Sequence, residues 1–143
     1  MAVTVQIIPE HNLVYVKYTG QMLVSETAAA LTEFAKHPLA GPGLRHLVDL
    51  TCLTDIDRDY AKFMELQAAK VETMASHGIE TFMVYLANTP VGLHAANLGK
   101  NGWTPESGVV AIVVENEDHA LVALGLPFDS IETLLEHSKA HSV

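Results

Sequence analysis

Residues 81–87 read Thr-Phe-Met-Val-Tyr-Leu-Ala, an almost unbroken apolar run. A strand that is apolar on both faces is typical of the middle of a sheet with helices packed on both sides. We therefore predict that Thr81 to Ala87 is a central strand. The segments before and after it then decide the class of fold.

Strands and helices alternate on both sides of this segment. Leu44 to Leu50 is a mostly apolar strand after the turn Gly41-Pro42-Gly43, and Val109 to Val114 is the last predicted strand. Helical spacing of apolar residues and helix-start or helix-stop signals predict the helices. They are expected at about residues 25–37, 57–78, 88–100, 117–124 and 130–139.

The chain opens with a hairpin. Val3, Val5 and Ile7 alternate with polar residues, as in a half-buried strand, and residues 9–12 form a turn. Residues 13–18 form the second strand, which Gly20 ends. A hairpin followed by alternating helices and strands predicts a single α/β domain over residues 1–143, with a mixed, mostly parallel sheet covered by helices.

Capping residues and the spacing of apolar residues predict where the helices begin and which of their faces are apolar. Ser25 is expected to cap the first helix, Asp57 or Asp59 the second, and a capping box of Asp129 and Glu132 the last. Gly78 is expected to stop the second helix. The predicted apolar face of that helix consists of Tyr60, Met64, Ala68, Val71 and Ala75.

The final helix carries an apolar stripe of Ile131, Leu134 and Leu135 that must be buried. Two uses remain open for this stripe. It covers the domain's own sheet, or it forms the contact of a symmetric homodimer, the commonest oligomer.

Composition and charge limit the classes of partner that this chain can bind. Eight Lys and Arg against 17 Asp and Glu give a net charge of −9, with no basic block that could neutralise phosphates. We therefore expect no nucleic-acid or anionic-membrane partner. The apolar runs are too short to span a bilayer, a signal peptide is not expected, and the single Cys52 excludes an internal disulfide. These features predict a cytoplasmic protein that meets a basic protein patch or a neutral small molecule.

Two segments resemble the STAS domains of anti-sigma-factor antagonists and the SpoIIAA-like proteins grouped as STAS/SEC14-like. Residues 46–57, His-Leu-Val-Asp-Leu-Thr-Cys-Leu-Thr-Asp-Ile-Asp, resemble the family's strand, short loop and Ile-Asp-Ser-Ser-Gly at the head of its second helix. Residues 120–125, Ala-Leu-Val-Ala-Leu-Gly, are similar to the end of the family's last helix. The resemblance covers residues 3–126, so the helix at about 130–139 is an addition.

The resemblance implies a regulatory or protein-interaction domain, but one feature departs from it. The family's Ser-Ser-Gly falls on Arg58, Asp59 and Tyr60, so the phosphorylatable serine is absent. Phosphorylation works there by adding negative charge at a helix N-terminus, and it cannot do so at an arginine. In the family this region meets the partner. The resemblance therefore implies a contact surface centred on Asp57, Arg58, Asp59 and Tyr60, and reaching Phe63.

Motifs for metal and catalytic chemistry are weak. Asp55-x-Asp57-x-Asp59 has alternating carboxylates, but a calcium loop needs glycine and glutamate where this chain has Tyr60 and Leu66. No nucleophile elbow, P-loop or dinucleotide fingerprint occurs. We therefore predict no metal, no cofactor and no enzymatic activity, and a packing role for Cys52.

A small apolar ligand is the alternative to a protein partner. His94 and His119 are expected near the carboxyl edge of the sheet, where α/β folds commonly bind ligands, and Trp103 lies in a predicted loop. These three residues are the candidates for lining a pocket of a lipid or small-molecule carrier of SEC14-like type. An enzyme, the third hypothesis, would need either histidine to approach Asp49 or Cys52.

Overall fold

The computed structural model describes residues 2–41, 43–75 and 80–143, and does not describe the side chains of residues 72–75 and 106. The predicted helix stop at Gly78 lies outside the described residues. The strands are β1 (Val3–Ile8), β2 (Leu13–Met22), β3 (Arg45–Ile56), β4 (Thr81–Leu86), β5 (Val109–Val114) and β6 (His141–Ser142). The helices are α1 (Val24–Lys36), α2 (Tyr60–Ala75), α3 (Pro90–Asn101), α4 (Glu117–Ala123) and α5 (Ile131–Glu136).

The strands form one mixed sheet, which confirms the predicted α/β class. Their order is β5-β4-β3-β2-β1-β6. β2 to β5 run parallel, while β1 pairs antiparallel with β2 and with β6. Each step from β2 to β5 moves one place in the same direction. Since such crossovers are right-handed, α1, α2 and α3 must all lie on one face of the sheet.

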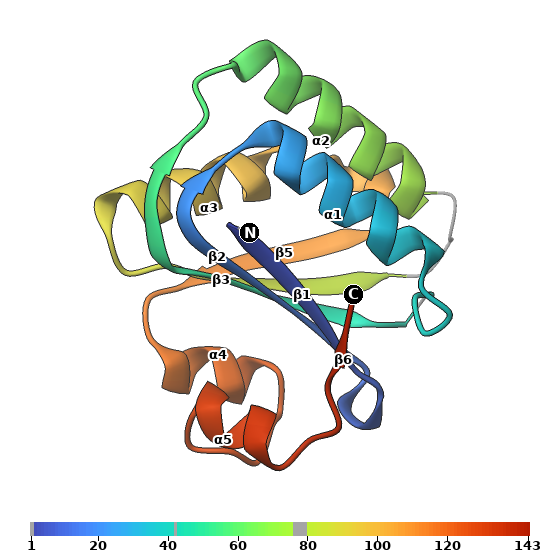
Figure 1. The fold of residues 1–143 in the computed structure, drawn as a ribbon, viewed down its shortest axis with the longest axis vertical. Coiled ribbons are helices and arrows are strands. Elements are labelled where there is room, and N and C mark those ends of the chain that lie inside the picture. Colours follow the sequence, from blue (N-terminus) through green and yellow to red (C-terminus); the bar gives the residue numbers. More distant parts are fainter. Residues whose placement is uncertain (1, 42, 76–79) are drawn as a thin grey trace.

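One core lies beneath those three helices. Tyr18, Leu50 and Tyr85 of the sheet pack there with Ala95 and Ala96 of α3, and half-buried side chains of α1 and α2 complete the cluster. Figure 1 shows the three helices above the sheet. The three crossovers leave the opposite face to be covered by the C-terminal part of the chain.

Helices α4 and α5 cover part of that opposite face (Figure 1). Leu121 and Leu134 are buried there against Leu13, Leu47 and Val84 of the sheet. On the same face, the outer half of the β1–β2 hairpin keeps Thr4 exposed and Lys17 half-buried. Because α4 and α5 are short, they leave the part of this face near β1 and β2 uncovered.

Two strands are longer than predicted. β3 continues past Leu50 to Ile56, and β2 continues past Gly20 to Met22. The two extensions pair with each other, with register shifts on both sides of Thr19 and Gly20. Gly20 adopts a positive φ of 74°, so it forms part of an irregular pairing and does not end the strand.

Two predicted helix caps are wrong and one is correct. Ser25 lies inside α1, whose first N–H, on Val24, donates to Asp57 Oδ2 at 3.2 Å. Asp59 precedes α2 and accepts from the Lys62 N–H at 3.2 Å, as predicted. The cap of α5 is Ser130 and not Asp129, because the Ser130 hydroxyl accepts from the Thr133 N–H at 3.0 Å.

The apolar stripe of α5 covers the domain's own sheet. Ile131 and Leu134 are 7% and 0% exposed, and both belong to the core under α4 and α5. Leu135 is half-buried beside it. Of the two uses left open for this stripe, the first is the one found, and the stripe is not free to form a homodimer.

We predict that Leu134→Ala lowers the free energy of unfolding by about 2–5 kcal/mol, because it removes a fully buried side chain and leaves a cavity. Chemical denaturation followed by circular dichroism measures this change. Glu136→Ala, an exposed position on the same helix, is the control and should change stability little. An unchanged midpoint for Leu134→Ala would contradict the packing of α5 on the sheet.

Candidate functional site

Asp57 joins the ends of three elements. Its N–H donates to the Met22 carbonyl at 2.7 Å, at the end of β2. Its two carboxylate oxygens accept from the N–H groups of Val24 at 3.2 Å and Asp59 at 3.1 Å. The hydrogen bonds from the Asp59 and Val24 N–H groups lower the pKa of Asp57. Asp57 thus fixes the loop before α2, and its carboxylate is occupied by backbone donors.

An apolar stripe on α2 faces solvent. Tyr60 is 50% exposed and Met64 is 60% exposed. Ala68, one further turn along, is exposed as well. All three belong to the predicted apolar face of this helix, in which Val71 is half-buried and the side chain of Ala75 lies outside the described part of the chain. The structure instead buries Gln67 of this helix, 4% exposed, with its Nε2 donating to the Gly99 carbonyl of α3 at 3.2 Å. We call Tyr60, Met64 and Ala68 the α2 stripe.

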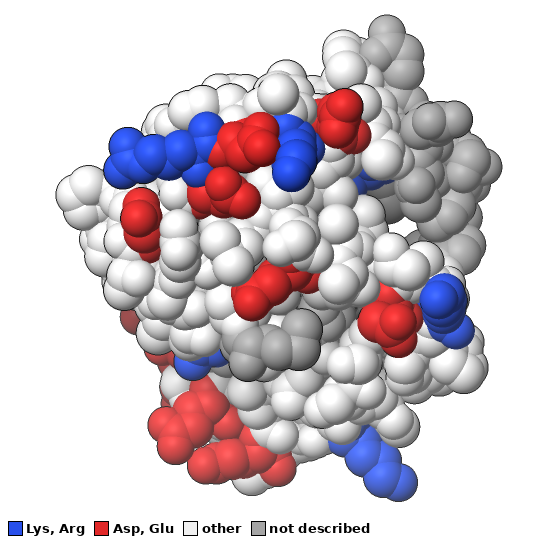
Figure 2. All heavy atoms as spheres, turned by 45° about the horizontal axis from the view of Figure 1, so that its top comes forward, with Lys and Arg blue, Asp and Glu red and all other residues white. Residues whose placement is uncertain are grey.

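Charged side chains of both signs border the α2 stripe. Arg58 lies 3.9 Å from Asp55, and Lys62 lies 3.8 Å from Asp59. Figure 2 shows positive and negative side chains alternating over the start of α2, beside uncharged surface. Exposed ion pairs of this kind contribute little to stability. An exposed apolar stripe with a charged border is typical of a surface that contacts another protein.

The five predicted contact residues divide into two groups. Arg58, Asp59 and Tyr60 are exposed and available to a partner. Asp57 and Phe63 are half-buried, the first in the loop hydrogen bonds and the second against the core beneath α1 to α3. The structure therefore brings all five together, but only three of them can supply much contact area.

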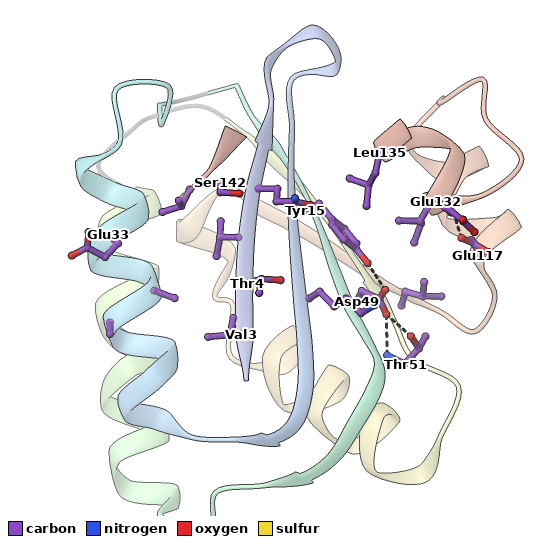
Figure 3. A pocket seen from close by; sticks show the side chains of 18 of the residues that line it. Val3, Thr4, Tyr15, Glu33, Asp49, Thr51, Glu117, Glu132, Leu135 and Ser142 are labelled. Atoms are coloured by element: carbon purple, nitrogen blue, oxygen red, sulfur yellow. Dashed lines mark hydrogen bonds between the residues drawn. The ribbon is translucent and has the colours of Figure 1, made fainter. Parts of the chain in front are cut away.

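A second candidate site is a groove of about 870 Å³ on the uncovered side of the opposite face. It runs alongside β1, between the sheet and α5, and continues past the strand edge towards α1 (Figure 3). Its lining is partly apolar and partly charged. The residues on the α4–α5 side of the sheet are Thr4, Gln6, Tyr15, Lys17, Asp49, Thr51, Leu86, Asn88, Glu117, Ile131, Glu132 and Leu135.

A buried carboxylate lies in the wall of the groove. Asp49, on β3, is 5% exposed. Its Oδ2 accepts from the Tyr15 hydroxyl at 2.6 Å, and its Oδ1 accepts from the Thr51 hydroxyl at 2.6 Å and the Thr51 N–H at 3.0 Å (Figure 3). Parallel pairing of β2 with β3 places Tyr15 and Asp49 two positions apart on the same face. We call Tyr15, Asp49 and Thr51 the Asp49 cluster.

Tyr15 is a hydrogen-bond donor in this cluster and not a base. Burial raises the pKa of its hydroxyl well above the usual value, and the hydrogen bond to Asp49 raises it further. The neutral hydroxyl is therefore retained at physiological pH. Its chemical role is to hold the Asp49 carboxylate in one orientation.

The three predicted pocket residues are not brought together. His94 is exposed on α3, and His119 is exposed on α4, on the other face of the sheet. Trp103 packs half-buried against the core beneath α1 to α3, where its Nε1 donates to the Tyr85 hydroxyl at 3.0 Å. Burial raises the pKa of that hydroxyl to about 12. None of the three lines the groove.

The enzyme hypothesis needed a histidine at Asp49 or Cys52. The hydrogen bonds of Asp49 go to Tyr15 and Thr51. Cys52 is exposed, so the predicted packing role of Cys52 is wrong. Within the described part of the chain, no three His, Cys, Asp or Glu side chains are grouped so that they could hold a metal ion.

The resemblance placed a contact surface at the start of α2, which stays a prediction, and sequence reasoning missed the groove. The one signal for the groove was Asp49, a single carboxylate in an otherwise mostly apolar strand. Its partner Tyr15 lies 34 residues away in the chain. No local pattern links the two positions.

Known proteins add no identification. No model of a protein family matches the chain, and no curated protein matches it significantly. Among the described residues, no helix has both the length and the apolar character needed to cross a membrane.

We predict that Tyr15→Phe lowers the free energy of unfolding by about 1–3 kcal/mol at neutral pH, because the buried Asp49 oxygen loses its donor. The difference in unfolding free energy between wild type and Tyr15→Phe should then shrink as the pH rises above about 10, the ordinary pKa of tyrosine. In that range the unfolded chain releases the Tyr15 proton while the folded chain retains it, so wild-type stability falls.

Urea titrations of both proteins between pH 7 and 11 test this prediction. The difference in unfolding free energy should be constant below pH 9 and shrink above about pH 10. Tyr60→Phe, at an exposed tyrosine, is the matched control and should behave as wild type. A difference that stays constant up to pH 11 would exclude a protonated Tyr15 in the folded state as the cause.

Proposed function

We propose that this chain is a non-enzymatic protein-interaction domain of STAS-like type that lacks the phosphorylatable serine. The observation that carries the proposal is the α2 stripe, an apolar surface left uncovered at the start of α2. Exposing such side chains to water is unfavourable, and a partner that covers them would recover that free energy.

The position of the stripe agrees with the surface expected from the resemblance. The family's serine position falls on Arg58, in the loop fixed by Asp57 immediately before α2. The β-β-α-β-α-β-α-β order is the expected one, and α4 (Glu117–Ala123) includes the start of the segment 120–125 that resembles the end of the family's last helix. These features support membership of the STAS-like group, which stays a proposal.

The chemistry of the surface defines the partner. Tyr60 and Met64 offer an aromatic ring and a flexible thioether, both common at the centres of protein contacts. The net charge of −9 favours a partner with a basic border around an apolar pocket. We further propose that this contact takes place in the cytoplasm, as the sequence predicts.

A small-molecule carrier is the second candidate, and the groove is the observation in its favour. A lipid carrier needs an apolar chamber, whereas this groove is open and has the Asp49 carboxylate in its wall. The groove therefore suits a polar ligand better than the apolar one first considered.

We predict that Tyr60→Ser with Met64→Ser weakens partner binding by about tenfold or more, because exposed aromatic anchors often dominate contact energies. The partner is first identified by placing a photo-crosslinking amino acid at position 64 and analysing adducts from native cell extract by mass spectrometry. Binding of that protein to the variants is then measured by calorimetry.

Val122 supplies the matched control. It is 78% exposed on α4, on the opposite face of the sheet. A crosslinker at position 122 should not capture the same protein, and Val122→Ser should bind it as wild type does. Equal capture from both positions, or unchanged binding by the double variant, would refute the assignment. If the only adducts found join two copies of this chain, the partner is a second copy, and the surface is a homodimer contact.

A further inference from the structure

The groove lies on the face of the sheet opposite α2, and the proposed protein contact makes no use of it. Its charges are unbalanced. Among the described residues that line it, Asp49, Glu117, Glu132 and Glu33 are acidic, and Lys17 is the one base. Figure 2 shows acidic side chains gathered at the lower edge of the molecule, where α4 and α5 lie. An anionic ligand would be repelled from such a groove, and a cationic one would be attracted.

Asp49 makes a cation preferable to a neutral ligand. A carboxylate has about four acceptor positions, and the Asp49 cluster occupies three of them. In the part of the chain that the structure describes, no Lys, Arg or His lies within ion-pair distance of this 5% exposed side chain. Lys17 is the register partner of Asp49 on β2 and lines the same groove without forming an ion pair with it. Burying a carboxylate without a direct ion pair is costly, and a ligand that forms one would lower that cost.

The shape and lining of the groove point to an organic cation and not to a metal ion. The described acidic side chains do not converge closely enough to form a metal site. The apolar residues that line the groove on the α4–α5 side of the sheet are Leu86, Ile131 and Leu135. In Figure 3, Leu135 and Glu132 project from α5 on the same side of the sheet as Asp49. An ammonium or guanidinium group at Asp49 would therefore have room for an apolar body against α5.

We propose that this groove binds a small organic cation, an amine or guanidine with an apolar body. Its charged head donates to Asp49 Oδ2, beside the Tyr15 hydroxyl. Its body lies against Leu135, and Glu132 adds a favourable charge at the opening. Tyr15 and Thr51 hold the carboxylate in place before the ligand arrives, so little ordering is needed on binding.

Phenethylamine and agmatine are the probes, and 2-phenylethanol is the neutral control of nearly the same shape as phenethylamine. Titrations followed by two-dimensional NMR should show saturable shifts at Asp49, Thr51 and Leu135 with at least one of the cations. The alcohol should bind about tenfold more weakly or worse, because it cannot form a charge-assisted hydrogen bond. Affinity should fall as salt rises.

Variants locate the site. Asp49→Asn should weaken cation binding by about tenfold or more. If that variant does not fold, Glu132→Gln serves, since residue 132 is exposed, and about a twofold to threefold loss is expected. Glu136→Gln is the matched control, on the same helix and equally exposed but outside the groove lining, and should bind as wild type.

Three results would overturn the proposal. They are the absence of saturable shifts with both cations, equal affinity for phenethylamine and 2-phenylethanol, and equal losses for Glu132→Gln and Glu136→Gln. The Tyr60→Ser and Met64→Ser double variant should keep full cation binding. The experiments can therefore refute the proposed protein contact and the proposed cation site independently of each other.

Discussion

The right-handed crossover is the constraint on which the rest of the structure depends. β2 to β5 follow one another in a single direction across the sheet, so the three connecting helices must lie on one face. The other face has only α4 and α5, which are short. This division explains both candidate sites. One face has more helix surface than the sheet can cover, and the other has more sheet than the helices can cover.

On the crowded face, α2 is held by polar contacts as well as by packing. Gln67 donates to the Gly99 carbonyl of α3, and Asp57 fixes the loop before the helix. Phe63 is turned towards the core, while Tyr60 and Met64 remain outside. The helix therefore buries Gln67 and packs Phe63 on the core, while the α2 stripe stays exposed.

On the open face, the Asp49 cluster is a polar group in a mostly apolar environment. A tyrosine and a threonine provide its hydrogen bonds. Lys17 is its neighbour on β2, but among the described residues no base forms an ion pair with it. Such an arrangement is costly for stability compared with an apolar residue of similar size. A ligand that uses the carboxylate gives a physical reason for its presence at the wall of a groove.

Periodicity and turn residues in the sequence determined the α/β class and the order of the strands and helices up to α5, because these depend on neighbours within a few residues. They did not predict β6, and they left open which surface buries the α5 stripe. The sequence also located the loop before α2 as a surface. Only the tertiary structure decided which face of α2 is buried, how far β2 and β3 extend, and that Tyr15 meets Asp49. These features depend on contacts between segments distant in the chain: the pairing of β2 with β3, and the packing of α2 on α3. No local pattern encodes them.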